Sequence, residues 1–90
     1  MQFEWDAQKH AANQRKHEVG FREATTVFGD PFATTFVDPE HSISEQTYLT
    51  IDSSVRGRLL VVAHTERGGA IRIISARPAT PRERRFYEEE

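Results

Sequence analysis

The spacing of hydrophobic and polar residues predicts that the first third of the chain is a short strand followed by a helix. "QFEW" alternates as a strand does, and Asp6 is suited to cap a helix over "AQKHAANQRKH", which is rich in good helix formers. Large apolar residues are missing from that segment. We therefore expect a largely exposed helix that touches the core through Ala7, Ala11 and Ala12.

A second helix is predicted over "FREATTVF", after Gly20 interrupts the first. Phe21, Ala24 and Phe28 fall on one face of it at helical spacing, and the sequence Gly-Asp-Pro ends it. From there the hydrophobic period shortens to two, which is typical of strands. Four strands are predicted, over "FATTFVD", "QTYLTID", "RLLVVAHTE" and "AIRIISAR".

The last two of these strands are nearly continuously apolar, as expected for central strands covered on both faces. The glycine pair in "RGGA" is typical of the tight turn of a hairpin. A last helix is predicted to begin after Thr80, with Pro81 in its first position and Glu83 completing a capping box. The order β-α-α-β-β-β-β-α predicts an α+β fold with a mainly antiparallel sheet packed by helices.

A two-residue turn at Gly68 and Gly69 would set the register of the central hairpin. Cross-strand partners share a face of a sheet. The predicted pairs are Glu66–Ile71, His64–Ile73, Val62–Ser75 and Leu60–Arg77. Arg58, His64, Ser75 and Arg77 are then expected on one face, with Thr65, Arg67 and Arg72 on the other. Strict alternation also sends Arg72 and Arg77 to opposite faces, so we predict that Arg77 meets a ligand and Arg72 forms a structural ion pair.

Length and composition narrow the class of protein. Ninety residues are expected to form a single domain, 1–90, and there is no cysteine for disulfides, thiolate chemistry or metal binding. No apolar run is long enough to span a bilayer, and the N-terminal residues lack the pattern of a signal peptide. We therefore expect a soluble, cytoplasmic protein without membrane partners.

The charged residues favour contacts to discrete anions over a diffuse basic surface. The net charge is −2, yet the cations are ten arginines and only two lysines, and arginine suits bidentate contacts to phosphate or carboxylate. The four histidines are scattered without metal-binding spacing, so no metal or other cofactor is expected. Imidazole, guanidinium and carboxylate groups suffice for cleavage of RNA through attack of its own 2′-OH. That reaction needs a base for the hydroxyl, cations for the phosphorane and an acid for the leaving 5′ oxygen.

Several short motifs, in order along nearly the whole chain, resemble the BrnT family. They are the Trp-Asp start (Trp5, Asp6), the N-x-x-K-H end of the first helix (Asn13, Lys16, His17), the F-x-E-A start of the second, the strand R-I-I-S-A-R (Arg72 to Arg77) and the E-R-x-x-Y of the last helix (Glu83, Arg84, Tyr87). The resemblance implies a RelE-like fold and the toxin half of a BrnT–BrnA type II toxin–antitoxin module. It also implies metal-free RNA cleavage that inhibits translation and growth.

The resemblance implies the partners, while the motifs, the predicted sheet faces and the last helix together supply the candidate functional residues. The expected partners are an RNA substrate and a BrnA-type antitoxin, with operator DNA reached only through the antitoxin. The catalytic candidates are Lys16, His17, His64 and Arg77; the RNA-binding candidates are Arg58, Arg67 and Arg72; the antitoxin-binding candidates are Arg82, Arg84, Arg85, Phe86 and Tyr87. Which catalytic group is the acid and which the base stays open.

Three positions depart from the family pattern and lower the positive charge where RNA is expected. Glu18 stands where a glycine is usual, Gln46 where an arginine is frequent, and Pro78 where a basic residue is usual. Catalytic weakening is therefore an alternative, in which the same fold only binds its antitoxin.

Structural roles are the competing interpretation for the individual residues. Arginines at strand ends commonly pair with carboxylates, and a histidine that ends a helix can satisfy terminal carbonyls. His64 lies within an apolar run, where a half-buried histidine with its hydrogen bonds satisfied is the alternative to a catalytic one.

Overall fold

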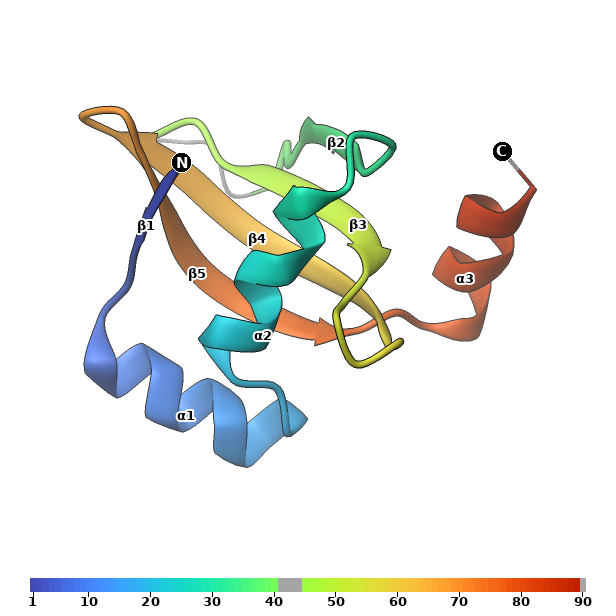
Figure 1. The fold of residues 1–90 in the computed structure, drawn as a ribbon, viewed down its shortest axis with the longest axis horizontal. Helices are drawn as coiled ribbons and strands as arrows, with labels where there is room; N and C mark the ends of the chain where they lie inside the picture. The colour runs from blue at the N-terminus through green and yellow to red at the C-terminus, as the bar shows by residue number, and fades with distance from the viewer. Residues whose placement is uncertain (41–44, 90) are drawn as a thin grey trace.

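The structure is a computed structural model that describes residues 1–40 and 45–89 (Figure 1). Its elements are β1 (Gln2–Glu4), α1 (Ala7–His17), α2 (Phe21–Thr25), the 3-10 helix η1 (Thr26–Gly29), β2 (Thr34–Val37), β3 (Tyr48–Ser53), β4 (Leu59–Arg67), β5 (Ala70–Pro78) and α3 (Pro81–Glu88). The predicted β-α-α-β-β-β-β-α order and α+β class are confirmed. The end of the second predicted helix is the 3-10 turn η1.

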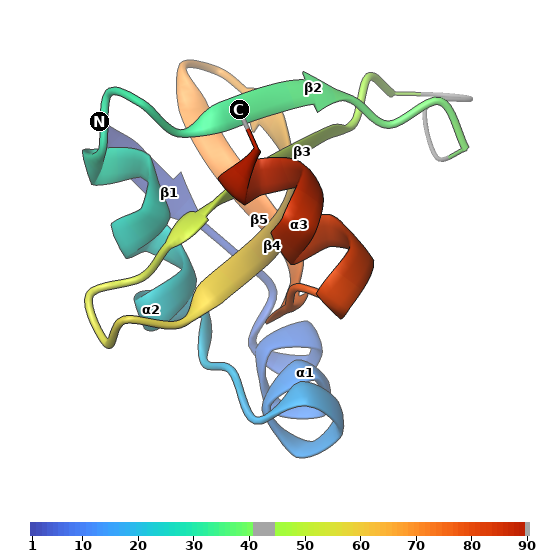
Figure 2. The same ribbon diagram turned by 90° about the vertical axis from the view of Figure 1, so that its right-hand side faces the viewer.

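The five strands form one sheet in the order β1-β5-β4-β3-β2. The β1–β5 pair is parallel and the other pairs are antiparallel. Figure 2 shows α2 and α3 on opposite sides of this sheet, while α1 lies at one end of it. We call the side of α2 the covered face and the side of α3 the open face.

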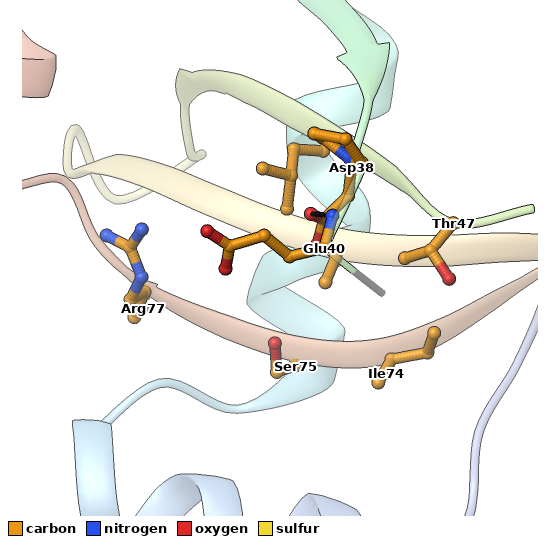
Figure 3. Close-up of a pocket in the computed structure, with 9 residues that line it drawn as sticks. Asp38, Glu40, Thr47, Ile74, Ser75 and Arg77 are labelled. Carbon is orange, nitrogen blue, oxygen red and sulfur yellow. Dashed lines mark hydrogen bonds between the residues drawn. The ribbon is translucent and has the colours of Figure 1, made fainter. Parts of the chain in front are cut away.

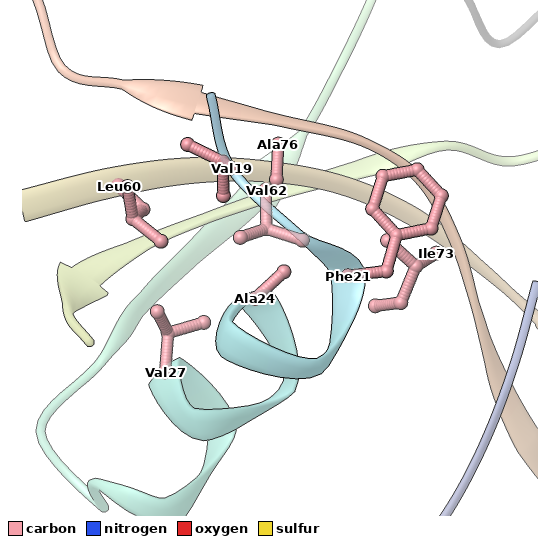
Figure 4. Close-up of a cluster of buried hydrophobic side chains, with 8 residues drawn as sticks. All are labelled: Val19, Phe21, Ala24, Val27, Leu60, Val62, Ile73 and Ala76. Atoms are coloured by element: carbon pink, nitrogen blue, oxygen red, sulfur yellow. The ribbon is translucent and has the colours of Figure 1, made fainter. Parts of the chain in front are cut away.

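The main core lies on the covered face, between the sheet and α2 (Figure 4). Phe21 has no exposed surface and contacts Trp5 edge-on at 6.1 Å between ring centres. Burying such a side chain contributes about 2 to 3 kcal/mol. The buried members of this cluster are Val19, Phe21, Ala24, Val27, Leu60, Val62, Ile73 and Ala76.

A smaller cluster occupies one end of the open face. Ile51, Leu59 and Val61 are buried there, and Tyr87 of α3 packs against them. The central strands are thus covered on both faces only where α3 lies, and the remainder of the open face is hollowed.

A β-bulge at Ile74 changes the predicted register of the central hairpin. The turn at Gly68 and Gly69 is confirmed, since both glycines have positive φ, and so are the pairs Glu66–Ile71 and His64–Ile73. Beyond His64 the prediction is wrong, because Ile74 is an extra residue in β5. The observed pairs there are Ala63–Ser75, Val62–Ala76, Val61–Arg77 and Leu60–Pro78.

The bulge moves Arg77 to the face opposite His64. Arg72 pairs with Thr65 and Arg77 pairs with Val61, two residues on the same side of β4. Arg72 and Arg77 therefore both lie on the open face, although strict alternation predicted opposite faces. The predicted shared face of His64 and Arg77 is wrong for the same reason.

Helix α1 docks through polar side chains. Ala7, Ala11 and Ala12 are all exposed, so the predicted alanine contact face is wrong. The buried residue is Asn13, whose Nδ2 donates to the carbonyls of Val19 (2.9 Å) and Ala76 (2.8 Å). Its Oδ1 accepts from the Ala76 amide at 3.1 Å, so this one side chain holds α1 against β5.

Side chains cap both long helices as predicted. Asp6 accepts from the amides of Gln8 and Lys9 at the start of α1. Thr80 and Glu83 form the reciprocal capping box at the start of α3.

Candidate functional site on the open face

A hollow on the open face, which we call the Arg77 groove, crosses the middle of the sheet (Figure 3). Its floor comes from β3, β4 and β5, and one wall comes from the chain that follows β2. The volume is about 650 Å³. The lining residues are Asp38, Pro39, Glu40, Thr47, Leu49, Ala63, Ile74, Ser75 and Arg77.

Arg77 supplies the cation of this groove and is held by Glu83 of α3. Its Nη1 donates to Glu83 Oε1 at 2.7 Å and its Nη2 to Oε2 at 2.8 Å, a bidentate pair. The guanidinium holds the pKa of Glu83 down at about 2, and the carboxylate raises the pKa of Arg77 in turn. The Nε–H of Arg77 has no partner among the described residues, so it remains available to donate to a ligand.

Two carboxylates line the groove with Arg77. Asp38 is buried, and its Oδ1 accepts from the Glu40 amide at 3.1 Å, which closes a turn. Glu40 is exposed, and its side chain extends toward the Arg77 end of the groove (Figure 3). Sequence reasoning missed Glu40, because no motif marks it and only the fold of the chain after β2 brings it across from Arg77.

His64, a predicted catalytic residue, lies within the covered face with 5% exposure. Its Nε2 is 2.7 Å from the hydroxyl of Thr50, and its ring stacks on Tyr48 and meets Phe28 edge-on. Burial lowers its pKa to about 4, so the ring is neutral near pH 7. Its Nδ1 is buried without a hydrogen-bond partner in the described structure.

Lys16 and His17 lie at the C-terminal end of α1, Lys16 exposed and His17 half-buried. Within the described part of the chain, no hydrogen bond or ion pair links either of them to Arg77. His17 is nevertheless one helical turn beyond Asn13, which binds the main chain of Ala76, the neighbour of Arg77. The end of α1 therefore lies beside the part of β5 that carries Arg77.

Arg58, a predicted RNA-binding residue, is occupied in a structural cluster. Its Nε donates to Glu23 Oε2 at 2.9 Å, and a second bond joins its Nη2 to Oε1 of the same carboxylate. Ser54 also donates to Glu23 at 2.7 Å, and Arg58 donates to the Glu18 carbonyl at 3.1 Å. These bonds lower the pKa of Glu23, with Arg58 as the largest cause. The cluster ties the β3–β4 connection to α2.

Arg67 and Arg72 lie on the open face near the hairpin turn, away from Arg77. Arg67 pairs with Glu45 at 3.1 Å, and both side chains are substantially exposed. Arg72 pairs with Glu4 of the neighbouring strand at 3.4 Å. The predicted structural ion pair of Arg72 is thus present, and both guanidinium groups lie on the same face of the sheet as Arg77.

The α3 residues predicted to bind the antitoxin divide into two groups. Tyr87 turns inward and donates its hydroxyl to the buried carboxylate of Asp52. That bond raises the pKa of Tyr87 to about 12, and burial is the main cause that raises the pKa of Asp52. Arg82, Arg84, Arg85 and Phe86 are exposed, with Phe86 at 60%.

A second hollow, which we call the α3 groove, lies between α3 and the β2–β3 side of the open face. Its volume is about 270 Å³. It shares Leu49 with the Arg77 groove, so the two hollows adjoin. The lining residues are Phe36, Leu49, Ile51, Val61, Arg82, Glu83 and Phe86.

Glu18, one of the three positions that depart from the family pattern, occupies a backbone conformation that favours glycine. It is the C-cap of α1 with φ of 58°, and its amide donates to the Gln14 carbonyl at 3.0 Å. Left-handed backbone costs a non-glycine residue about 1 kcal/mol. This conformation is the physical reason why a glycine would be favoured at this position.

No group of three or more His, Cys, Asp or Glu side chains in residues 1–40 and 45–89 is placed to hold a metal ion. None of the helices there has the length and apolar character that crossing a membrane requires. His41, one of the scattered histidines, falls outside the described residues.

Comparison with known proteins identifies a family and a solved structure with a similar fold. The model of the family described as "Ribonuclease toxin, BrnT, of type II toxin-antitoxin system" matches residues 5–83. The crystal structure of the Brucella abortus ribonuclease toxin BrnT is similar with a TM-score of 0.66, covering 89% of this chain and 97% of that one. Sequence identity is 22%, so this match shows the shared fold. No curated protein matches this chain.

Proposed function

This chain belongs to the BrnT family of ribonuclease toxins of type II toxin–antitoxin systems, and on that premise we propose that it is a metal-independent endoribonuclease of the cytoplasm. The 2′-OH of the substrate RNA attacks the adjacent phosphorus while the bond to the 5′ oxygen breaks. The products are a 2′,3′-cyclic phosphate and a free 5′-OH. Three groups suffice for this reaction: a base for the 2′-OH, a cation for the phosphorane and an acid for the leaving oxygen.

The observation that carries the proposal is the Arg77 groove. It is an open hollow with Arg77 at one end and the exposed carboxylate of Glu40 across from it. Guanidinium and carboxylate groups in one groove can bind a phosphate and accept a proton from the neighbouring ribose. In the other described hollow the carboxylate, Glu83, is already bonded to Arg77, whereas Glu40 is exposed.

We assign the phosphate to Arg77 and the 2′-OH proton to Glu40. Arg77 donates through its Nε–H, which Glu83 leaves free, and Glu83 keeps the guanidinium in place. His17 is assigned the proton to the 5′ oxygen, because Asn13 holds its helix beside Ala76. Lys16, next to it, adds positive charge at the same end.

His64 has no place in this scheme. It lies on the covered face at 5% exposure, on the far side of the sheet from Arg77. Arg58 is likewise held by Glu23. Arg67 and Arg72 remain the candidates for contacts to the RNA backbone beyond the cleavage point, since both lie on the open face.

The partner in the cell is proposed to be a BrnA-type antitoxin that neutralises the toxin and alone contacts operator DNA. Membership of the family supports an antitoxin partner. The exposed side chains of α3 support a contact there, because Arg82, Arg85 and Phe86 point to solvent and not into the fold.

A second candidate function, antitoxin binding without cleavage, is favoured by one observation. The Arg77 groove holds two carboxylates beside its single arginine, and both Nη atoms of that arginine are already bonded to Glu83. A groove of this charge attracts RNA less strongly than a basic one.

The test is cleavage of a structured RNA by purified protein in the presence of EDTA. We expect cleavage with a cyclic phosphate end, and none of a DNA strand of the same sequence. Arg77→Ala and Glu40→Gln are each expected to lower the rate about 100-fold, the usual loss when one transition-state contact is removed. Arg22→Ala and Glu89→Gln, both on exposed positions outside the groove, serve as matched controls.

Two results would contradict the assignment. Cleavage that EDTA abolishes would exclude the metal-independent mechanism. Unchanged rates in both groove variants would place the active site elsewhere. Absence of any cleavage by folded wild-type protein would favour the second candidate function.

A further inference from the structure

The α3 groove is apolar at its base and open to solvent. Phe86 of α3 is 60% exposed and Phe36 of β2 is 44% exposed, and both line this hollow. Single exposed apolar side chains are ordinary on a protein surface. Two aromatic side chains from separate elements that border one hollow form a continuous apolar patch, which is typical of a binding site.

The rim of the groove on the α3 side is positively charged. Arg82 lines the hollow, and neither it nor the exposed Arg85 has an ion pair within the described part of the chain. Glu83, the carboxylate on the same wall, is neutralised by Arg77. The groove therefore presents an apolar base beside guanidinium groups without partners, and its complement is a large apolar side chain flanked by carboxylates.

On its β2 side the groove lies at an edge of the sheet, because β2 is the last strand in the strand order. In the described structure β2 pairs only with β3, so its other edge carries main-chain groups that no strand covers. Phe36 pairs with Leu49, which places its side chain on the open face over the groove. A chain segment that lies along β2 would pass directly beside this hollow, and strand addition at a free edge is a common mode of peptide recognition.

We propose that the α3 groove is the docking site for a segment of the antitoxin that carries one large apolar side chain flanked by acidic residues. The identity of the partner rests on the proposed function, whereas the chemistry of the segment follows from the groove itself. The apolar side chain enters between Phe36 and Phe86, and a carboxylate meets Arg82. The segment also contacts Glu83, so docking takes place next to the residue that holds Arg77.

The experiment measures binding of the purified full-length toxin to the antitoxin encoded beside it, by calorimetry. Phe86→Ser and Arg82→Glu are each expected to weaken binding at least 10-fold, and the loss in Arg82→Glu to shrink at high salt. Phe32→Ser and Arg22→Glu are the matched controls, since both positions are exposed and line neither groove. Hydrogen exchange of the complex should show protection of residues 34–37.

The proposal is overturned if Phe86→Ser and Arg82→Glu bind as wild type does. It is also overturned if Ser75→Arg, within the Arg77 groove, abolishes binding while the α3 variants do not. RNA cleavage by the same variants is measured separately, so neither of these binding results depends on whether the protein cleaves RNA. Loss of cleavage with intact binding would count against the proposed function and leave this docking site supported.

Discussion

The two faces of the same sheet differ in what they do with charged and polar side chains. On the covered face they are removed from solvent and bonded internally, as His64 is to Thr50. On the open face the cations of the sheet itself are paired but remain accessible, as Arg77 is with Glu83. Burial, more than residue type, therefore separates the structural from the candidate functional groups of this protein.

The bulge at Ile74 is what makes this division possible within one strand. It lets β5 present Ile73 and Ala76 to the core and both Arg72 and Arg77 to the open face. A regular strand would have turned one of these arginines into the core, where an unpaired charge is costly. Bulges are frequent beside functional sites for this reason.

We expect the largest difference in the free energy of unfolding when one aromatic side chain is removed from each face. Phe21→Ala, at a position with no exposure, should lower the free energy of unfolding by about 3 to 5 kcal/mol, the usual cost of such a cavity. Phe36→Ala, at 44% exposure, should cost less than about 1 kcal/mol. Urea denaturation measures both, and equal losses would contradict the assignment of the core to the covered face.

A pH dependence specific to the covered face is expected from His64. Its pKa is near 6.5 in the unfolded chain and about 4 in the folded protein. Between these pH values the unfolded state binds more protons than the folded state. The contribution of His64 to the free energy of unfolding is therefore complete above pH 6.5 and is lost as the pH falls to 4. The loss is about 3 kcal/mol over that window, at 1.4 kcal/mol for each pKa unit.

The measurement is the free energy of unfolding at pH 7.5, 6 and 5 for wild type and His64→Gln. Glutamine can keep a hydrogen bond to Thr50 but does not titrate. The variant should lose most of the slope in this range. An unchanged slope would show that His64 is not buried in its neutral form.

The smallest effect is expected at Glu18, outside both faces. Glu18→Gly should stabilise the protein by about 1 kcal/mol, because glycine adopts the left-handed C-cap conformation without steric cost. Thermal unfolding should show a rise of a few degrees. A lower melting temperature would mean that the Glu18 side chain makes a stabilising contribution larger than its backbone strain.

Local sequence signals were enough for the elements and their caps. The apolar, β-prone runs "RLLVVAHTE" and "AIRIISAR", the glycine pair between them and the Thr80–Glu83 box predicted the hairpin and α3 correctly, because propensity, turns and caps act over a few residues. The motifs likewise sufficed for the family. The contact face of α1 was mispredicted, because it is formed by Asn13 and not by apolar residues, so hydrophobic spacing carried no signal for it.

Local patterns and motifs in the chain were sufficient to predict the α+β fold class, the order of the elements and membership of the BrnT family. Tertiary structure alone decided which arginine faces the groove, because a single extra residue at Ile74 reverses the faces of every residue after it. It alone brought Glu40 across from Arg77 and buried His64. Register and long-range approach depend on the packing of distant segments, which no local pattern records.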